Sequence, residues 1–89
     1  MSFLSRTSDE FWEFYYALPT EVREQARKQF ALFRENPYHP SLRLKQIREL
    51  WIARVSRSYR AIAYQEGNVF YWFWIGTHDD YEKLLQRLK

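Results

Sequence analysis

Trp51–Tyr81 reads WIARVSRSYRAIAYQEGNVFYWFWIGTHDDY and contains three apolar runs of strand length. The runs cover residues 51–55, 59–64 and 69–75, and they are rich in the aromatic and β-branched side chains that suit a pleated, half-buried surface. Gly67, in the link between the second and third runs, can adopt positive φ and favours a hairpin there. The third run has no polar residue, which indicates cover on both faces and an interior place in the sheet. We therefore predict a three-stranded antiparallel meander.

A first helix is predicted over residues 8–17. Aromatic residues recur along it at helical spacing, which is typical of a stripe facing a core: Phe11, Phe14 and Tyr15. Thr7 and Glu10 have the spacing of a capping box, in which the Thr7 hydroxyl accepts from the Glu10 amide. We therefore expect Thr7 to be the N-cap.

A second helix is predicted over residues 20–35, with Thr20 as its N-cap. Its apolar face is formed by Val22, Ala26, Phe30 and Phe33. Asn36 ends the helix because the following Pro37 disfavours the α conformation at position 36. Only residues 18–19 separate the two helices, so we expect an αα-hairpin packed on one face of the sheet.

Three weaker elements complete the chain. Residues 3–6 are predicted to be a short strand, and residues 43–47 a strand or extended arm, although the same residues also fit a loop. A C-terminal helix is predicted from Asp79 or Asp80 to Leu88, with an apolar face that includes Tyr81, Leu84, Leu85 and Leu88. The predicted fold class is therefore α+β, an N-terminal α-hairpin on a small antiparallel β-sheet with a short C-terminal helix. At 89 residues, the chain is expected to form one domain over residues 1–89.

Composition narrows the compartment and the chemistry. The chain has no Cys, which excludes disulfides and thiolate metal sites, and its 20% aromatic content is expected to build the core instead. It shows neither a signal-peptide pattern nor an apolar run long enough for a spanning helix, which indicates a cytoplasmic protein without a membrane partner. It has no paired His spacing, no Gly-rich phosphate loop and no G-x-S-x-G elbow. We therefore expect no metal, no small-molecule cofactor and no acyl transfer.

Positive charge is concentrated in one part of the chain. The net charge is only +3, but residues 41–60 carry six Lys/Arg against one Asp/Glu. The six are Arg43, Lys45, Arg48, Arg54, Arg57 and Arg60. Such a basic surface over a sheet is typical of binding to a polyanion or to an acidic protein, and the alternative is that these side chains are solvated and prevent sheet edges from pairing.

The only cluster that combines His, Asp and Tyr is residues 76–81, directly after the third run. His78 can exchange a proton near neutral pH, whereas the neighbouring aspartates also fit helix capping and Tyr81 also fits a core position. Attack of a ribose 2′-OH on its own phosphate needs a base, an acid and cations for the developing charge, and no metal. His78 is the candidate acid or base for this reaction. The candidate cations are Arg57, Arg60, Lys45 and Arg54, although Arg57 and Arg60 also fit surface charge flanking a turn.

Short motifs follow one another along nearly the whole chain: Leu18-Pro19 before a charged helix, NPYHPSL at residues 36–42 with Lys45, Trp51 with Arg54-Val55, Ser58-Tyr59-Arg60, the aromatic run, and GTHDDY at residues 76–81. In this order they resemble the toxins of the RelE/ParE superfamily of bacterial type II toxin–antitoxin systems, particularly the RelE-like branch. The resemblance implies an α+β fold, ribosome-dependent cleavage of mRNA and neutralisation by a cognate antitoxin that wraps the toxin.

The resemblance also implies roles for individual residues. Arg60 matches a phosphate-binding arginine, His78 a basic or histidine side chain at the end of the last strand, and Tyr81 an aromatic that stacks on a base or assists proton transfer. The family's basic positions correspond loosely to Lys45, Arg54 and Arg57, and a histidine of some members corresponds to His39. The catalytic candidates are therefore His78, Arg60 and Tyr81, and the candidates for RNA or phosphate binding are Lys45, Arg54, Arg57 and His39.

Two alternatives to an mRNA-cleaving enzyme stay open at this point. The ParE branch poisons DNA gyrase without cutting RNA, and it shares the fold and much of the sequence pattern. A catalytically inactive relative that only binds an antitoxin would also fit the pattern.

Overall fold

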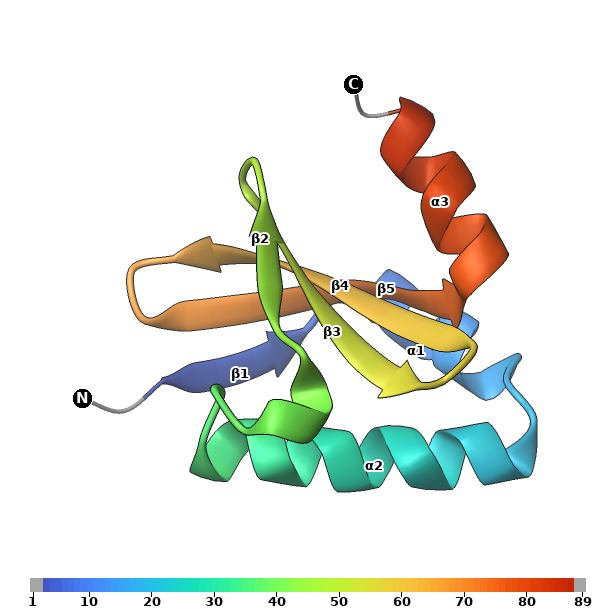
Figure 1. The fold of residues 1–89 in the computed structure, drawn as a ribbon, viewed down its shortest axis with the longest axis horizontal. Coiled ribbons are helices and arrows are strands. Elements are labelled where there is room, and N and C mark those ends of the chain that lie inside the picture. Colours follow the sequence, from blue (N-terminus) through green and yellow to red (C-terminus); the bar gives the residue numbers. More distant parts are fainter. Residues whose placement is uncertain (1–2, 88–89) are drawn as a thin grey trace.

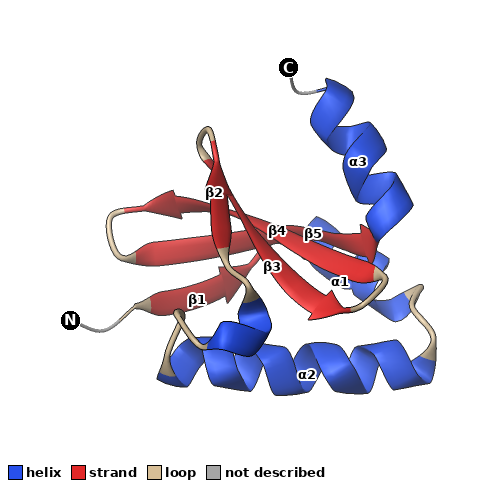
Figure 2. Ribbon diagram, viewed as in Figure 1, coloured by secondary structure: helices blue, strands red, loops and turns tan. Residues whose placement is uncertain are grey.

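The computed structural model describes residues 3–87, in which helices lie on both faces of one β-sheet (Figures 1 and 2). In chain order the elements are β1 (Leu4–Thr7), α1 (Asp9–Tyr16), α2 (Thr20–Glu35), the 3-10 helix η1 (Pro40–Leu42), β2 (Lys45–Ile47), β3 (Leu50–Ser56), β4 (Tyr59–Glu66), β5 (Val69–Thr77) and α3 (His78–Arg87). None of the helices in this part of the chain has both the length and the apolar character needed to cross a lipid bilayer. Leu88, expected on the apolar face of the last helix, lies outside the described residues.

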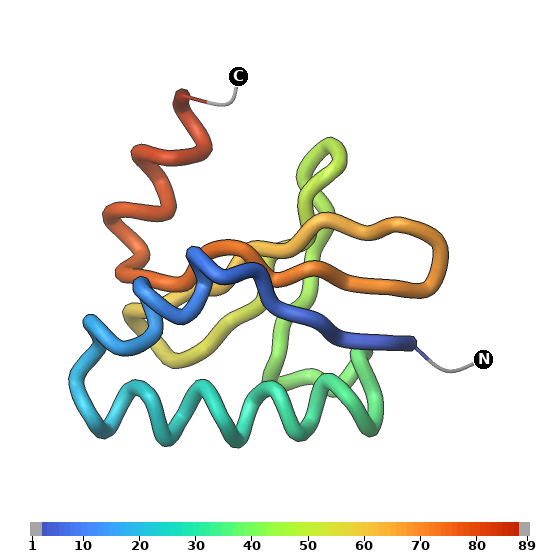
Figure 3. The backbone as a smooth tube through the Cα atoms, turned by 180° about the vertical axis from the view of Figure 1, so that it is seen from behind, coloured from blue at the N-terminus to red at the C-terminus, as the bar shows by residue number. Residues whose placement is uncertain are grey.

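The five strands form one sheet in the order β1-β5-β4-β3-β2. β3, β4 and β5 are the predicted antiparallel meander, with Gly67 at φ +59° in the turn between β4 and β5. β1 pairs in parallel with β5, from Leu4 opposite Val69 to Thr7 opposite Trp72, and Figure 3 shows it running beside β5 before it leads into α1. The α+β fold class is confirmed, but the sheet is mixed. A parallel neighbour is possible because a long crossover through both helices, rather than a hairpin, joins β1 to the meander.

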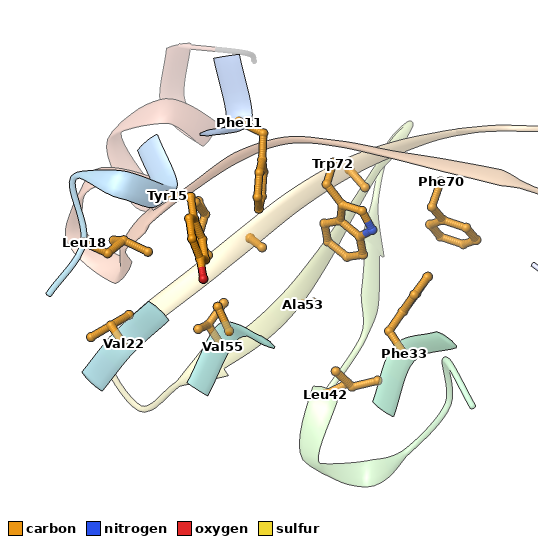
Figure 4. Packing of buried hydrophobic residues seen from close by; sticks show 14 residues of the cluster. Phe11, Tyr15, Leu18, Val22, Phe33, Leu42, Ala53, Val55, Phe70 and Trp72 are labelled. Atoms are coloured by element: carbon orange, nitrogen blue, oxygen red, sulfur yellow. The ribbon is translucent and has the colours of Figure 1, made fainter. Parts of the chain in front are cut away.

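The main core lies between the sheet and the helices α1 and α2, as the predicted hairpin required (Figure 4). Trp72 of β5 has no exposed surface and lies at its centre. The ring centroid of Trp72 is 5.3 Å from that of Phe30 and 5.2 Å from that of Phe33, both in edge-to-face arrangements. Its indole N–H donates to Ser5 Oγ at 3.0 Å. Trp72 therefore joins β1, β5 and α2 in one packed unit.

α3 covers the opposite face of the sheet at one end only, because it leaves the end of β5 and points away from α2 (Figure 1). Under its first turns Ile52, Ile62 and Tyr81 form a second, smaller core. At the other end of this face Tyr64 stacks on Tyr71 at 5.1 Å between ring centroids and stays 39% exposed. The predicted interior place of β5 is confirmed, since it lies between β1 and β4 and none of its residues is exposed, although α3 covers only one end of this face.

A β-bulge in β5 explains why its side chains do not alternate strictly between the two faces of the sheet. Ile62 lies opposite Trp74, whereas the next residue, Ala63, lies opposite Trp72. Phe73 is thus the extra residue, and it packs with Trp74 on the α3 side of the sheet. The bulge places two consecutive aromatic side chains on one face, which simple alternation does not predict.

The helix caps differ from the predicted ones. Ser8, not Thr7, is the N-cap of α1, and its Oγ accepts from the Phe11 N–H at 3.3 Å. Thr7 is the last residue of β1, so its backbone is engaged in the sheet. Pro19 occupies the cap position of α2 without a side-chain bond, and Thr20 is the first helical residue.

Ser8→Ala is expected to lower the free energy of unfolding by about 1 kcal/mol, because the Phe11 amide loses its side-chain acceptor and keeps only the Ser8 carbonyl at 3.2 Å. Thr7→Ala is the matched control, and we expect it to cost less than about 0.5 kcal/mol because that hydroxyl caps nothing. Urea denaturation followed by circular dichroism measures both values. Equal losses in the two variants would contradict the cap assignment.

Candidate functional site

The turn between β3 and β4 and the junction of β5 with α3 enclose a hollow of about 460 Å³. We name it the Arg60 hollow, and it is lined by Arg57, Ser58, Arg60, Thr77, His78 and Asp79. Its two sides are held together by the sheet, in which Tyr59 lies opposite Thr77, and by the His78 N–H, which donates to the Ser58 carbonyl at 2.7 Å. Arg60 and His78 are thus brought to one hollow by main-chain bonds alone.

Arg60 is anchored to the backbone of the β3–β4 turn. Its Nη1 donates to the carbonyl oxygens of Ser56 at 2.8 Å, Tyr59 at 2.9 Å and Arg57 at 3.4 Å. Nη1 carries two hydrogens, so one of them is shared between two carbonyls; these bonds orient the guanidinium and do not use its Nε and Nη2 donors.

Charge around Arg60 is unbalanced. Burial, and then the charge of its cross-strand neighbour Arg54, lower the pKa of the Arg60 guanidinium, while Tyr81 and Glu82 oppose this and Arg43 adds to it. An arginine stays protonated despite such a shift, so the two facing guanidinium groups repel each other. A bound anion would relieve this repulsion, as expected of a phosphate site.

His78 is the first residue of α3 and is partly exposed. Its Nε2 lies 3.4 Å from Glu82 Oε1 one helical turn further on, and 43% of the His78 side chain is exposed. The His78 ring centroid is 5.6 Å from that of Tyr81. The imidazole therefore has a carboxylate that can orient it and remains accessible to a ligand.

Glu82 was not identified from the sequence as a partner of His78, because the last helix was expected to begin at Asp79 or Asp80 and therefore to exclude His78. The helix begins earlier because Thr77 caps it, its Oγ1 accepting from the Asp80 N–H at 3.1 Å. With His78 as a helical residue, the i,i+4 spacing of His78 and Glu82 predicts that their side chains are neighbours on the helix surface.

Lys45 and Tyr81 meet on the α3 side of the sheet. Lys45 is exposed at the start of β2, and its Nζ lies 6.0 Å from the Tyr81 ring centroid. Tyr81 is only 2% exposed and packs with Ile52 and Ile62. Its ring has no free face for a base, so the stacking role implied by the resemblance does not fit, whereas packing beneath Lys45 and beside His78 does.

The remaining two candidates occupy different settings. Arg57 is exposed in the β3–β4 turn and lines the Arg60 hollow. His39 precedes η1, which packs on α2 and β3, and its Nδ1 accepts from the Ser41 N–H at 3.2 Å. The structure thus brings Arg57, Arg60 and His78 together, with Arg54 beside Arg60, and leaves His39 in its own loop.

The Arg60 hollow combines the groups that bind a phosphodiester and move a proton. Guanidinium groups bind phosphate oxygens through charge-assisted hydrogen bonds, and an imidazole donates or accepts a proton near neutral pH. Among residues 3–87, no three His, Asp or Glu side chains lie close enough together to hold a metal ion.

Solved toxin structures share this fold. E. coli YafQ superposes with a TM-score of 0.71 at 11% identity over 89% of this chain and 97% of its own. The isolated E. coli RelE toxin gives 0.63 at 17% identity over 99% and 100%, and the RelB–RelE complex of Methanococcus jannaschii gives 0.68 at 13% identity over 89% and 96%. No curated protein sequence matches the chain. The fold is therefore that of the RelE-like toxins.

The sequence of residues 20–83 matches the family model of the ParE-like toxin domain. The chain belongs to this family, and it is a type II toxin of the RelE/ParE superfamily. The predicted superfamily is thus confirmed, at the level that both branches share.

Proposed function

We propose that the protein is an endoribonuclease toxin that cleaves mRNA on the ribosome and so inhibits translation in the cytoplasm. The observation that carries the proposal is the Arg60 hollow, where two arginines and a histidine line one accessible space. The RelE-like fold supports it as well.

In the proposed reaction, the 2′-OH attacks the neighbouring phosphorus and the bond to the 5′ oxygen breaks, which leaves a 2′,3′-cyclic phosphate and a 5′-OH. Arg57 and Arg60 bind the non-bridging oxygens and stabilise the charge that grows on them. His78 transfers the proton at one of the two reacting oxygens, with solvent serving the other, and Glu82 orients its ring. Lys45 and Arg54 add positive charge along the path of the RNA backbone.

The proposed protein partner is a cognate antitoxin, since E. coli YafQ and RelE relatives have been crystallised as complexes with antitoxins. An apolar groove of about 490 Å³ lies between the β2–β3 hairpin and α3. Its apolar lining is formed by Ile47, Leu50, Phe73, Leu84 and Leu85. We expect an amphipathic antitoxin segment to cover it, because apolar grooves of this kind take the apolar face of a helix.

The deciding experiment is induction of the toxin in bacteria without its antitoxin, followed by mapping of mRNA 5′ ends. We expect growth arrest and new 5′-OH ends within translated regions. In a purified system, the same ends should appear on translated mRNA and be absent from naked mRNA. Growth arrest with intact messages would contradict the proposal.

Gyrase poisoning is the second candidate, because the matching family model is described as ParE-like. In that case induction would leave mRNA intact, and purified gyrase would accumulate cleaved DNA in the presence of the toxin. If induction changes neither growth nor mRNA, the chain acts only as an antitoxin-binding relative.

A further inference from the structure

A second hollow adjoins the Arg60 hollow, because Thr77 lines both. It has a volume of about 400 Å³ and lies between the end of α1, the end of β5 and α3. This volume is within the range of ~300–1,000 Å³ found for small-ligand sites. We name it the Trp74 hollow, and the lining residues that matter here are Phe14, Trp74, Thr77, Asp80, Lys83 and Arg87.

The Trp74 indole can occupy this hollow because residue 76 is a glycine. A Cβ atom on Gly76 would lie 2.6 Å from Trp74 Cζ2 and 2.8 Å from Cη2, so the indole occupies space that only glycine leaves. The Phe14 ring lies at 6.2 Å from Trp74 between centroids, tilted by 54°, and Phe14 is 41% exposed. Phe14 was expected in the core stripe of the first helix, but it faces this hollow instead. The two rings form a partly exposed aromatic surface that the main core does not use.

Polar and charged groups surround the two rings. Lys83 and Arg87 are exposed, lie one turn apart on α3 and line the hollow, as do Thr77 and Asp80. Aromatic faces bind bases by stacking, cations bind the neighbouring phosphates, and hydroxyl and carboxylate groups bind base edges. This combination matches one nucleotide of single-stranded RNA better than it matches an apolar ligand.

We infer that the Trp74 hollow binds the base of a nucleotide adjacent to the phosphodiester held in the Arg60 hollow, and thereby selects which sequences are cut. The inference rests on the proposed nuclease function, since it needs an RNA in the Arg60 hollow. The shared Thr77 places the two hollows side by side, as binding of two successive nucleotides requires.

The test uses a trinucleotide of 2′-O-methyl RNA, which cannot be cleaved because its nucleophile is blocked, and the same trinucleotide with an abasic central residue. NMR titration follows the indole N–H of Trp74, identified from its loss in Trp74→Phe. We expect the base-containing trinucleotide to shift this resonance and to bind about tenfold more weakly to Phe14→Ala than to the wild type. Trp12→Ala, which removes another exposed aromatic of α1 outside the hollow, is the matched control and should bind normally.

Gly76→Ala is the second variant, because it keeps both aromatic residues but displaces the indole. If thermal melts show it to be folded, it should lose affinity as Phe14→Ala does. Equal affinity of the base-containing and abasic trinucleotides would overturn the inference, as would an unchanged set of cleavage sites in Phe14→Ala. Base-dependent binding at Trp74 without cleavage of any RNA would support the base site and refute the nuclease function.

Discussion

Replacing His78 with alanine is expected to reduce the rate of RNA cleavage by about 10²- to 10⁴-fold, the range typical of losing a side chain that transfers a proton. The variant should fold, because the bond to the Ser58 carbonyl is made by the main chain and the side chain is 43% exposed. The measurement is the single-turnover rate of mRNA cleavage in a purified translation system, with thermal melts to compare the folds.

Glu82→Gln separates orientation from chemistry at the same site. Glutamine keeps the shape of the side chain 3.4 Å from His78 Nε2 but removes its charge, so we expect a smaller loss than in His78→Ala and a changed pH profile. A purely structural role of Glu82 would alter the melting temperature and leave the pH profile as it was.

Substitution of Arg60 tests the Arg60 hollow independently of His78. Arg60→Ala should lose transition-state stabilisation, and Arg60→Lys should restore little of it, because a lysine cannot donate from one planar group to the turn carbonyls and to a phosphate together. Arg27→Ala, which removes an exposed arginine of α2 outside the hollow, controls for the loss of general positive charge. Full activity of both His78→Ala and Arg60→Ala would contradict the assignment of this site.

The meander was readable from the sequence because its signals are local. Strand-forming residues, the Gly67 turn and the spacing of the strands are all contained within Trp51–Tyr81, and the structure follows them. The two helices were readable for the same reason, since periodicity and the Pro37 stop act over a few residues.

The features that were missed depend on contacts between distant segments. Thr7 and Ser8 are both good caps, and the choice of Ser8 is made by pairing of β1 with β5, which keeps Thr7 in the strand. The bulge at Phe73 likewise follows from the register of β4 against β5. No short window of sequence contains these constraints.

For the candidate site as well, some features could be predicted from the sequence and others could not. Arg60 and His78 lie at a strand start and a strand end that an antiparallel hairpin brings to one edge, so their proximity follows from the predicted topology. The burial of Tyr81 depends on how α3 packs over Ile52 and Ile62, which the helix pattern allowed but did not decide. Phe14 contacts Trp74 rather than the main core, and Trp74 is available to it because the bulge places that residue on the α3 side.

Trp72→Ala is expected to have the largest effect on stability, a loss of about 3–5 kcal/mol in the free energy of unfolding. Trp72 is 0% exposed, and the surrounding Phe30 and Phe33 rings come from α2, which cannot fill the vacated space without shifting toward the sheet and disturbing its other contacts. Small domains are stable by only ~5–15 kcal/mol, and each kcal/mol corresponds to roughly 4–8 °C in melting temperature at this size. Thermal melts should therefore show a loss of more than about 10 °C.

Two further variants show which contact of Trp72 is responsible. Trp72→Phe keeps a ring against Phe33 but loses the N–H that donates to Ser5 Oγ, so it should lie between the wild type and Trp72→Ala. Ser5→Ala breaks the same bond from the other side while leaving the indole in place. Tyr38→Ala, at an aromatic residue that is 71% exposed, should change stability by less than about 0.5 kcal/mol. If Trp72→Ala had the same melting temperature as Tyr38→Ala, the packing of α2 on β5 would not be what stabilises the sheet. The strands that position the Arg60 hollow would then have to be held by other contacts.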